Sequence, residues 1–229
     1  MVDGTGRVIL PPVLLGLTVV TGLVDAVSYL ALGHVFTANM TGNVVFLGFA
    51  VAGAPGLSVM RSGMAVVAFF AGAVIGGRMA ARMSVGCRRR WTGAAFGAEA
   101  ALFLAATAVA LGYRSGLSNE PTRLHTVIVL TGLAMGIRNA TVRKLAVPDL
   151  TTTVLTLTLT GLAADSRLAG GSNQGWATRA ASIGAMFAGA AVGAWLLGYS
   201  LALVLALCAV VSTACATAAL VGGRRFHAT

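Results

Sequence analysis

Residues 36–43 read FTANMTGN and place two asparagines and two threonines inside a strongly apolar chain. Hydrophobic residues make up 57% of the 229 residues and charged residues 10%, and the mean hydropathy is +0.88. Ordinary soluble domains are about one quarter charged. The composition therefore predicts an integral membrane protein, in which the polar stretch 36–43 needs a structural or functional reason.

Apolar runs on both sides of this stretch are long enough to cross a hydrocarbon core about 30 Å thick, which needs about 20 helical residues. Two shorter runs, 35–53 and 147–164, carry most of the remaining polar side chains. The second contains TTTVLTLTLT (151–160), which alternates like a strand. An open strand cannot face lipid, so we expect helix or enclosed irregular backbone there. The long runs are residues 13–32, 60–80, 92–112, 124–142, 177–197 and 199–221.

The distribution of Lys and Arg separates two possible topologies. If both short runs cross the membrane, the chain has eight shorter spans, and each side receives eight of the sixteen basic residues. If both runs return to the side they entered, six spans remain and thirteen basic residues lie on one side. The positive-inside rule makes that side cytoplasmic. We therefore expect an all-α membrane protein with six transmembrane helices, two short re-entrant or broken polar segments and both termini in the cytoplasm.

The order of long and short runs occurs twice along the chain, which indicates an internal repeat. Residues 22–26 (GLVDA) match residues 136–140 (GIRNA) in spacing, and each stretch precedes one of the short runs. Polar residues correspond at the same interval of fourteen residues in the pairs Asp25 and Asn39, and Asn139 and Thr153. With three spans in each half the second copy must be inverted, a design common in transporters and channels. We expect one polytopic domain over residues 1–229, with repeat halves at 13–90 and 124–221.

Asp25, Glu99 and Arg138 are ionisable residues within the long apolar runs. Asp25 lies about halfway along the first run, where an ionised carboxylate costs about 2.5 to 3.5 kcal/mol on insertion scales. It is either a proton- or cation-binding group on a path, or a neutral, hydrogen-bonded residue that holds the first span to its neighbours. Glu99 and Arg138 lie at similar depths from the cytoplasmic side, so we expect a structural ion pair between their helices.

The stretch 36–43 fits a break of the chain within the membrane. Gly42 permits a turn, and the amide and hydroxyl groups around it can satisfy freed backbone groups or contact a solute. The alternative is a continuous helix whose Thr and Asn side chains bond to neighbouring helices. The predicted path-lining or substrate-binding residues are Asp25, Asn39, Thr41, Gly42, Asn43, Asn139 and Thr153.

The chain resembles the YoaK family of small bacterial multi-pass membrane proteins, catalogued as domain of unknown function 1275. Two segments carry the resemblance, GLVDAVSYLALGHVFTANMTGNVVFLG (22–48) and MGIRNATVRKLAVPDLTTTVLTLTLTGLA (135–163), and it extends over nearly the whole chain. The MTGN stretch after a span bearing Asp is its most specific part. The resemblance implies a protein of the bacterial cytoplasmic (inner) membrane, without a substrate or activity. The second half departs from it at Thr156-Leu157, where a Thr-Gly pair is expected.

Other classes of function lack a sequence signal. The chain has no Walker loop, dinucleotide fingerprint, HExxH or GxSxG motif, so we expect neither an enzyme nor a cofactor. Its three histidines and three cysteines are not spaced for a metal site. The basic residues behind the net charge of +10 lie in segments between apolar runs. We therefore attribute the charge to membrane topology and not to a nucleic-acid partner.

Glycines four residues apart recur in the long runs. Such pairs let helix backbones approach closely, either within the chain or between copies in a homo-oligomer. The pairs are Gly72/Gly76, Gly93/Gly97, Gly132/Gly136 and Gly189/Gly193.

Two functions from different classes are therefore considered for this protein of the lipid bilayer. The first is a small transporter or channel for a small solute or ion, with the polar residues converging near the midplane. The second is a non-transporting membrane protein that binds a partner or lipid through CRRR (87–90); the alternative interpretation of this segment is that it is only a topology signal. The sequence favours the first.

Overall fold

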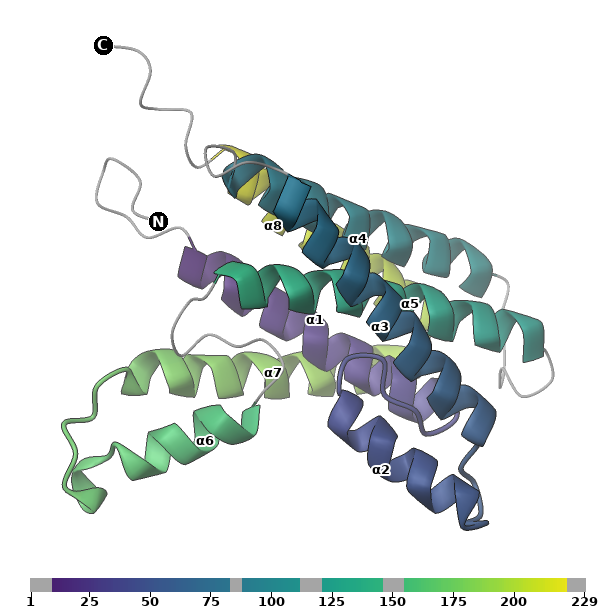
Figure 1. Cartoon of the computed structure of the whole chain (residues 1–229), viewed down its shortest axis with the longest axis horizontal. Coiled ribbons are helices and arrows are strands. Elements are labelled where there is room, and N and C mark those ends of the chain that lie inside the picture. The colour runs from purple at the N-terminus through teal and green to yellow at the C-terminus, as the bar shows by residue number, and fades with distance from the viewer. Residues whose placement is uncertain (1–9, 83–87, 112–120, 146–154, 222–229) are drawn as a thin grey trace.

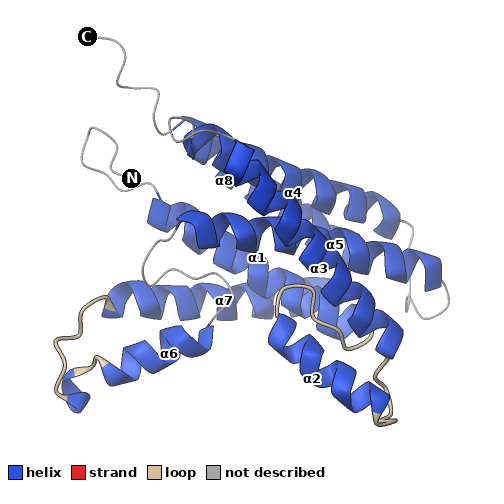
Figure 2. Cartoon of the chain, in the orientation of Figure 1, coloured by secondary structure: helices blue, strands red, loops and turns tan. Residues whose placement is uncertain are grey.

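The structure is a computed structural model, and it describes residues 10–82, 88–111, 121–145 and 155–221. Within these ranges all regular structure is helical (Figure 2). A short 3-10 helix, η3 (Arg167–Ala169), precedes α7. The α-helices in chain order are α1 (Leu10–Ala31), α2 (Met40–Val51), α3 (Val59–Arg82), α4 (Arg88–Ala110), α5 (Pro121–Leu145), α6 (Leu155–Ala164), α7 (Trp176–Leu197) and α8 (Leu201–Val221).

Five of the described helices are long and apolar enough to cross a membrane: α1, α3, α4, α7 and α8. α5 is equally long, with 25 residues, and carries Arg138 and Asn139 in its apolar stretch. The short helices α2 and α6 have 12 and 10 residues. At about 1.5 Å per residue they reach about 18 and 15 Å, roughly half of a hydrocarbon core. The all-α membrane fold is confirmed, and the count of six spans stays a prediction.

α1 begins and ends where its local sequence allows. Pro11 and Pro12 lie in its first turn, where the missing backbone N–H has no helical acceptor to lose. After Ala31 the chain leaves the helix at Gly33 and His34, which have φ values of +81° and +58°. His34 N donates to Tyr29 O at 3.2 Å and closes the last turn. The following residues, up to Asn39, are not helical.

Two helix pairs, α1 with α7 and α3 with α5, are among the most extensive contacts of the bundle. A Cβ atom on Gly22 would overlap the backbone of Ala190 in α7, and a Cβ on Gly136 would overlap the backbone of Ala73 in α3. Gly136 follows Gly22 by 114 residues, and Ala190 follows Ala73 by 117. The two pairs therefore use corresponding residues at their closest approach.

Glycines on the partner helices α3 and α7 show the same correspondence between the two pairs. A Cβ on Gly72 would overlap the backbone of Leu133, and a Cβ on Gly189 would overlap the backbone of Val19. These positions are again 117 and 114 residues apart. The glycines that the sequence analysis paired at four-residue spacing are therefore used largely inside the chain. Gly97 is an exception, because nothing lies within 4 Å of the position its Cβ would occupy.

The arrangement of the helices repeats in the second half with reversed direction. Figure 1 shows α1 and α5 running in opposite directions, and the same holds for α2 and α6, α3 and α7, and α4 and α8. Contacts correspond in the same way: α2 packs on α3 and α6 on α7, while α4 packs on α5 and α8 on α1. α4 and α8 also pack against each other. The pattern is that of two inverted copies.

Large apolar side chains on the outward faces of α3 and α7 suit a lipid environment. Phe70 and Phe187 are mostly exposed on these helices. Near the end of α7, Trp195 and Tyr199 meet edge to face with ring centroids 5.2 Å apart. Such amphipathic aromatic residues are typical of the membrane interface.

Candidate functional site

The FTANMTGN stretch forms the start of α2 and the segment that leads into it. The fully buried Asn43 side chain binds the backbone of Phe36 on both sides: its Oδ1 accepts from Phe36 N at 2.8 Å, and its Nδ2 donates to Phe36 O. Asn39 is the N-cap of α2, and its Oδ1 accepts from Gly42 N at 3.4 Å. Asn39 and Thr41 are exposed. The break therefore lies before α2, and its freed backbone groups are satisfied by asparagine side chains.

The predicted turn at Gly42 is wrong, because Gly42 lies in the first turn of α2. The chain turns instead at Gly33 and His34, where φ is positive. Gly42 is needed for another reason: a Cβ there would lie 2.8 Å from the ring of Phe36. That ring stacks on Tyr29 at 5.4 Å between centroids. Gly42 thus lets the non-helical segment fold flat against α2.

The two short helices have matching places in the fold. Figure 1 shows α2 and α6 below α1 and α7, with their N-terminal ends toward the middle and their C-terminal ends toward opposite ends of the bundle. Arg179 anchors the C-terminal end of α6, since its Nη1 donates to Gly161 O and Asp165 Oδ2, both at 2.7 Å. A cation at this position is favourable for the helix dipole. With 12 and 10 residues, each short helix is about half as long as the spans, and we call it a half-helix.

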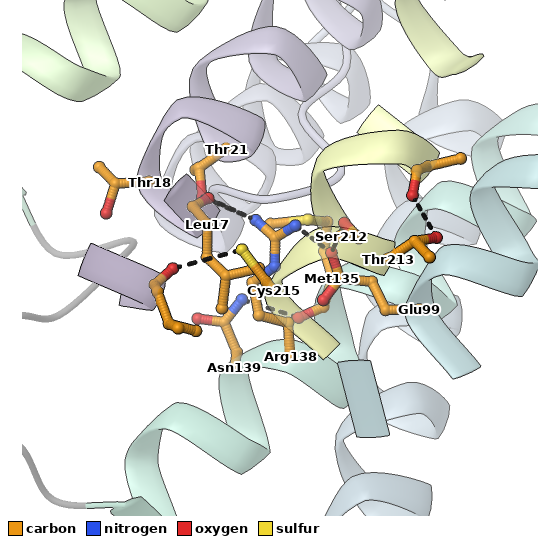
Figure 3. Close-up of polar contacts among 12 residues, drawn as sticks. Leu17, Thr18, Thr21, Glu99, Met135, Arg138, Asn139, Ser212, Thr213 and Cys215 are labelled. Carbon is orange, nitrogen blue, oxygen red and sulfur yellow. Dashed lines mark hydrogen bonds and ion pairs between the residues drawn. The ribbon is translucent and has the colours of Figure 1, made fainter. Parts of the chain in front are cut away.

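A buried ion pair lies between four of the long helices. Arg138 of α5 and Glu99 of α4 are both fully buried, and Arg138 Nη2 pairs with Glu99 Oε1 (Figure 3). Arg138 Nη1 donates to Leu17 O of α1 at 2.8 Å and to Thr21 Oγ1 at 3.1 Å. Ser212 Oγ of α8 donates to Glu99 Oε1 at 2.7 Å. These hydrogen bonds supply part of the partners that a buried charge pair requires.

Three buried polar atoms of this region have no hydrogen-bond partner among the described residues. They are Glu99 Oε2, Arg138 Nε and Asp25 Oδ1. Asp25 follows Leu17 and Thr21 on α1 at four-residue intervals, so it lies on the side of the helix that Arg138 contacts. Asp25 therefore belongs to the neighbourhood of the ion pair.

The same stripe of α1 continues to the break. Tyr29 follows Asp25 by four residues, and its ring stacks on Phe36, whose backbone is held by Asn43. One face of α1 thus carries the groups that hold the ion pair and, two turns further on, the ring that packs on the segment before α2. Thr37 lies in the non-helical segment before α2. Its side chain is fully buried, and its Oγ1 has no partner among the described residues.

Two predicted site residues remain, Asn139 and Thr153. Asn139 is partly buried, and its Nδ2 donates to Met135 O at 2.8 Å within α5 (Figure 3). Thr153 lies outside the described residues. Sequence reasoning missed Thr21 and Ser212, whose only signal is a hydroxyl on an otherwise apolar helix. No cluster of three potential metal ligands occurs among the described residues.

The comparisons with known proteins agree with a membrane protein. A family model described as "Protein of unknown function (DUF1275)" matches residues 13–218. The UPF0700 transmembrane protein YoaK of Bacillus subtilis (strain 168) is 37% identical over 151 residues, covering 65% of this chain and 64% of that protein. The match thus spans slightly less than two thirds of the relative's length. No solved structure matches the chain. The chain belongs to the DUF1275 family, the family of YoaK, and is a multi-pass transmembrane protein.

Proposed function

We propose that the protein is a small transporter or channel that moves a small solute or ion across the bacterial inner membrane. The observation that carries this proposal is the pair of half-helices, α2 and α6, set in two inverted copies of the same helix packing. Inverted repeats with broken helices that meet near the midplane are a recurrent transporter design. The N-terminal backbone of such half-helices offers free N–H groups and a positive dipole end to a solute.

The orientation is part of the proposal. The described basic residues at the ends of helices lie mainly at the end of the bundle where α1 begins and α8 ends, which we call the inner end. They include Arg78, Arg82, Arg89, Arg90, Arg143, Lys144 and Arg179, whereas Arg61 and Arg123 lie at the outer end. The positive-inside rule makes the inner end cytoplasmic.

The second candidate function, binding of a partner or lipid through CRRR (87–90), stays a prediction. Residues 83–87 lie outside the described residues. Homo-oligomerisation also stays a prediction, and the most tightly packed glycines contact helices of their own chain.

Transport is tested in reconstituted vesicles with a panel of monovalent cations, small carboxylates and amino acids as probes. We expect at least one probe to give a flux that depends on the protein, and Asp25→Asn to lower that flux to the level of empty vesicles while the protein stays folded. The reason is that Asp25 has a buried, unpartnered oxygen on the face of α1 that Arg138 contacts, and that it contributes little apolar packing. Asn39→Ala, which removes the cap of α2, should also lower the flux.

Thr18→Ala is the matched control on the same helix. Its hydroxyl donates to Leu14 O at 2.9 Å within α1, so its loss should leave the flux unchanged. Folding of each variant is checked by size-exclusion chromatography and thermal melting in detergent. Absence of a protein-dependent flux for every probe, or a full flux in Asp25→Asn, would contradict the proposal.

A further inference from the structure

The cluster around Arg138 contains two carboxyls and one guanidinium. Arg138 pairs with Glu99, and Asp25 lies one turn along α1 from Thr21, which Arg138 Nη1 contacts. With both carboxyls ionised the three groups carry one surplus negative charge. Such a charge is costly inside a membrane unless a proton or a cation meets it.

The neighbouring helices supply no described charge at this depth that would offset the surplus. On α8 the titratable groups are the buried thiols of Cys208 and Cys215. α7, which packs on α1, has Arg179 near its first turn and no other ionisable residue. The remaining ionisable residues of the helices packed around the cluster lie near helix ends: Arg61, Arg78 and Arg82 on α3, Arg88, Arg89 and Arg90 on α4, and Arg123, His125, Arg143 and Lys144 on α5.

The geometry favours a proton over a metal ion. The guanidinium lies against the Leu17–Thr21 turn of α1, where it would repel a second cation. No set of metal ligands surrounds the cluster among the described residues.

We infer that Asp25 and Glu99 share one exchangeable proton through Arg138, and that this cluster is the coupling-proton site of the transporter. That this proton is coupled to transport rests on the proposed function, whereas proton binding by itself does not. In the arrangement described, Arg138 engages Glu99 and the proton is bound as the Asp25 carboxylic acid. Release of the proton to water leaves the Asp25 carboxylate, and the Arg138 guanidinium then moves one turn along α1 to be shared by both carboxylates.

The proton is measured by infrared difference spectroscopy of the full chain in vesicles between alkaline and acidic pH, which separates protonated carboxyl from carboxylate. We expect one protonation per chain from this cluster. Asp25→Asn should remove it, because Arg138 then holds Glu99 ionised. Glu99→Gln should remove it as well, because Arg138 then turns to Asp25 and holds that group ionised. Asp25→Glu should retain it.

This paired loss distinguishes a shared proton from a merely structural acid. A structural Asp25 that is permanently neutral would give no pH-dependent signal, and an independent Asp25 would keep its signal in Glu99→Gln; either result overturns the inference. Should Glu99→Gln fail to fold, the contrast between Asp25→Asn and Asp25→Glu still tests whether Asp25 carries the proton, and a signal that persists in Asp25→Asn overturns the inference. A signal that follows Na⁺ at constant pH, with K⁺ as the control, would replace the proton by a metal cation and also overturns it.

Flux measurements on the same vesicles separate the two proposals. A flux that is independent of pH, with no carboxyl signal lost in Asp25→Asn, contradicts the proton site and leaves transport standing. A carboxyl signal lost in Asp25→Asn, without flux for any probe, supports the proton site and contradicts transport.

Discussion

Arg138→Met is expected to lower the free energy of unfolding by about 3 to 5 kcal/mol, because it leaves the fully buried Glu99 carboxyl without its counter-charge. Ser212 alone would remain as a hydrogen-bond donor to that carboxyl. Methionine keeps most of the apolar stem of arginine, so lost packing contributes little. Thermal melting and denaturant unfolding in detergent measure the loss.

The double variant Glu99→Gln/Arg138→Met should recover most of the lost stability, since it removes both buried charges together. Asp165→Asn is the control for an ion pair near the surface. The Asp165 side chain is 54% exposed, and its pairing with Arg179 should be worth at most about 1 kcal/mol. Equal melting of Arg138→Met and Asp165→Asn would show that the central pair does not hold the helices together.

Gly22→Ala and Gly136→Ala are expected to destabilise the fold by similar amounts, about 1 to 3 kcal/mol or more. In each case the added Cβ would overlap the backbone of a neighbouring helix, Met186 and Ala190 for Gly22 and Phe69 and Ala73 for Gly136. Backbone cannot move aside as a flexible side chain can, so the two helices must separate. Thermal stability in detergent, read by size-exclusion chromatography after heating, measures the effect.

Gly97→Ala is the matched control, because nothing lies within 4 Å of its Cβ position. It should be neutral or stabilising by up to about 1 kcal/mol through helix propensity. A strong loss for Gly22→Ala with none for Gly136→Ala would contradict the equivalence of the two helix pairs.

The long helices could be predicted from the sequence because apolar length is a local property. The predicted run 177–197 and the helix Trp176–Leu197 differ by one residue at the start. The pairing of Glu99 with Arg138 could also be expected, because equal depth brings two opposite charges within reach.

The place of the break could not be predicted, because it depends on contacts between residues apart in the chain. Gly42 attracted attention as a glycine among polar residues, yet the helix begins before it, because Asn39 caps α2 and Asn43 binds the backbone of Phe36. The shared neighbourhood of Asp25 and Arg138 was hidden for the same reason. It depends on which faces of α1 and α5 meet, and a single sequence does not specify faces on helices that are apolar all round.

The central claim is that the two short helices return to the side of the membrane from which they came. Single cysteines in the loops that follow them, Pro55→Cys after α2 and Ser172→Cys after α6, test it in a chain whose native cysteines are replaced by alanine. Both positions are exposed. An impermeant thiol reagent applied to intact cells should label Pro55→Cys, and should label Ser172→Cys only after the membrane is opened. Eight spans would put both loops on one side, so labelling of both from the same side would contradict the account.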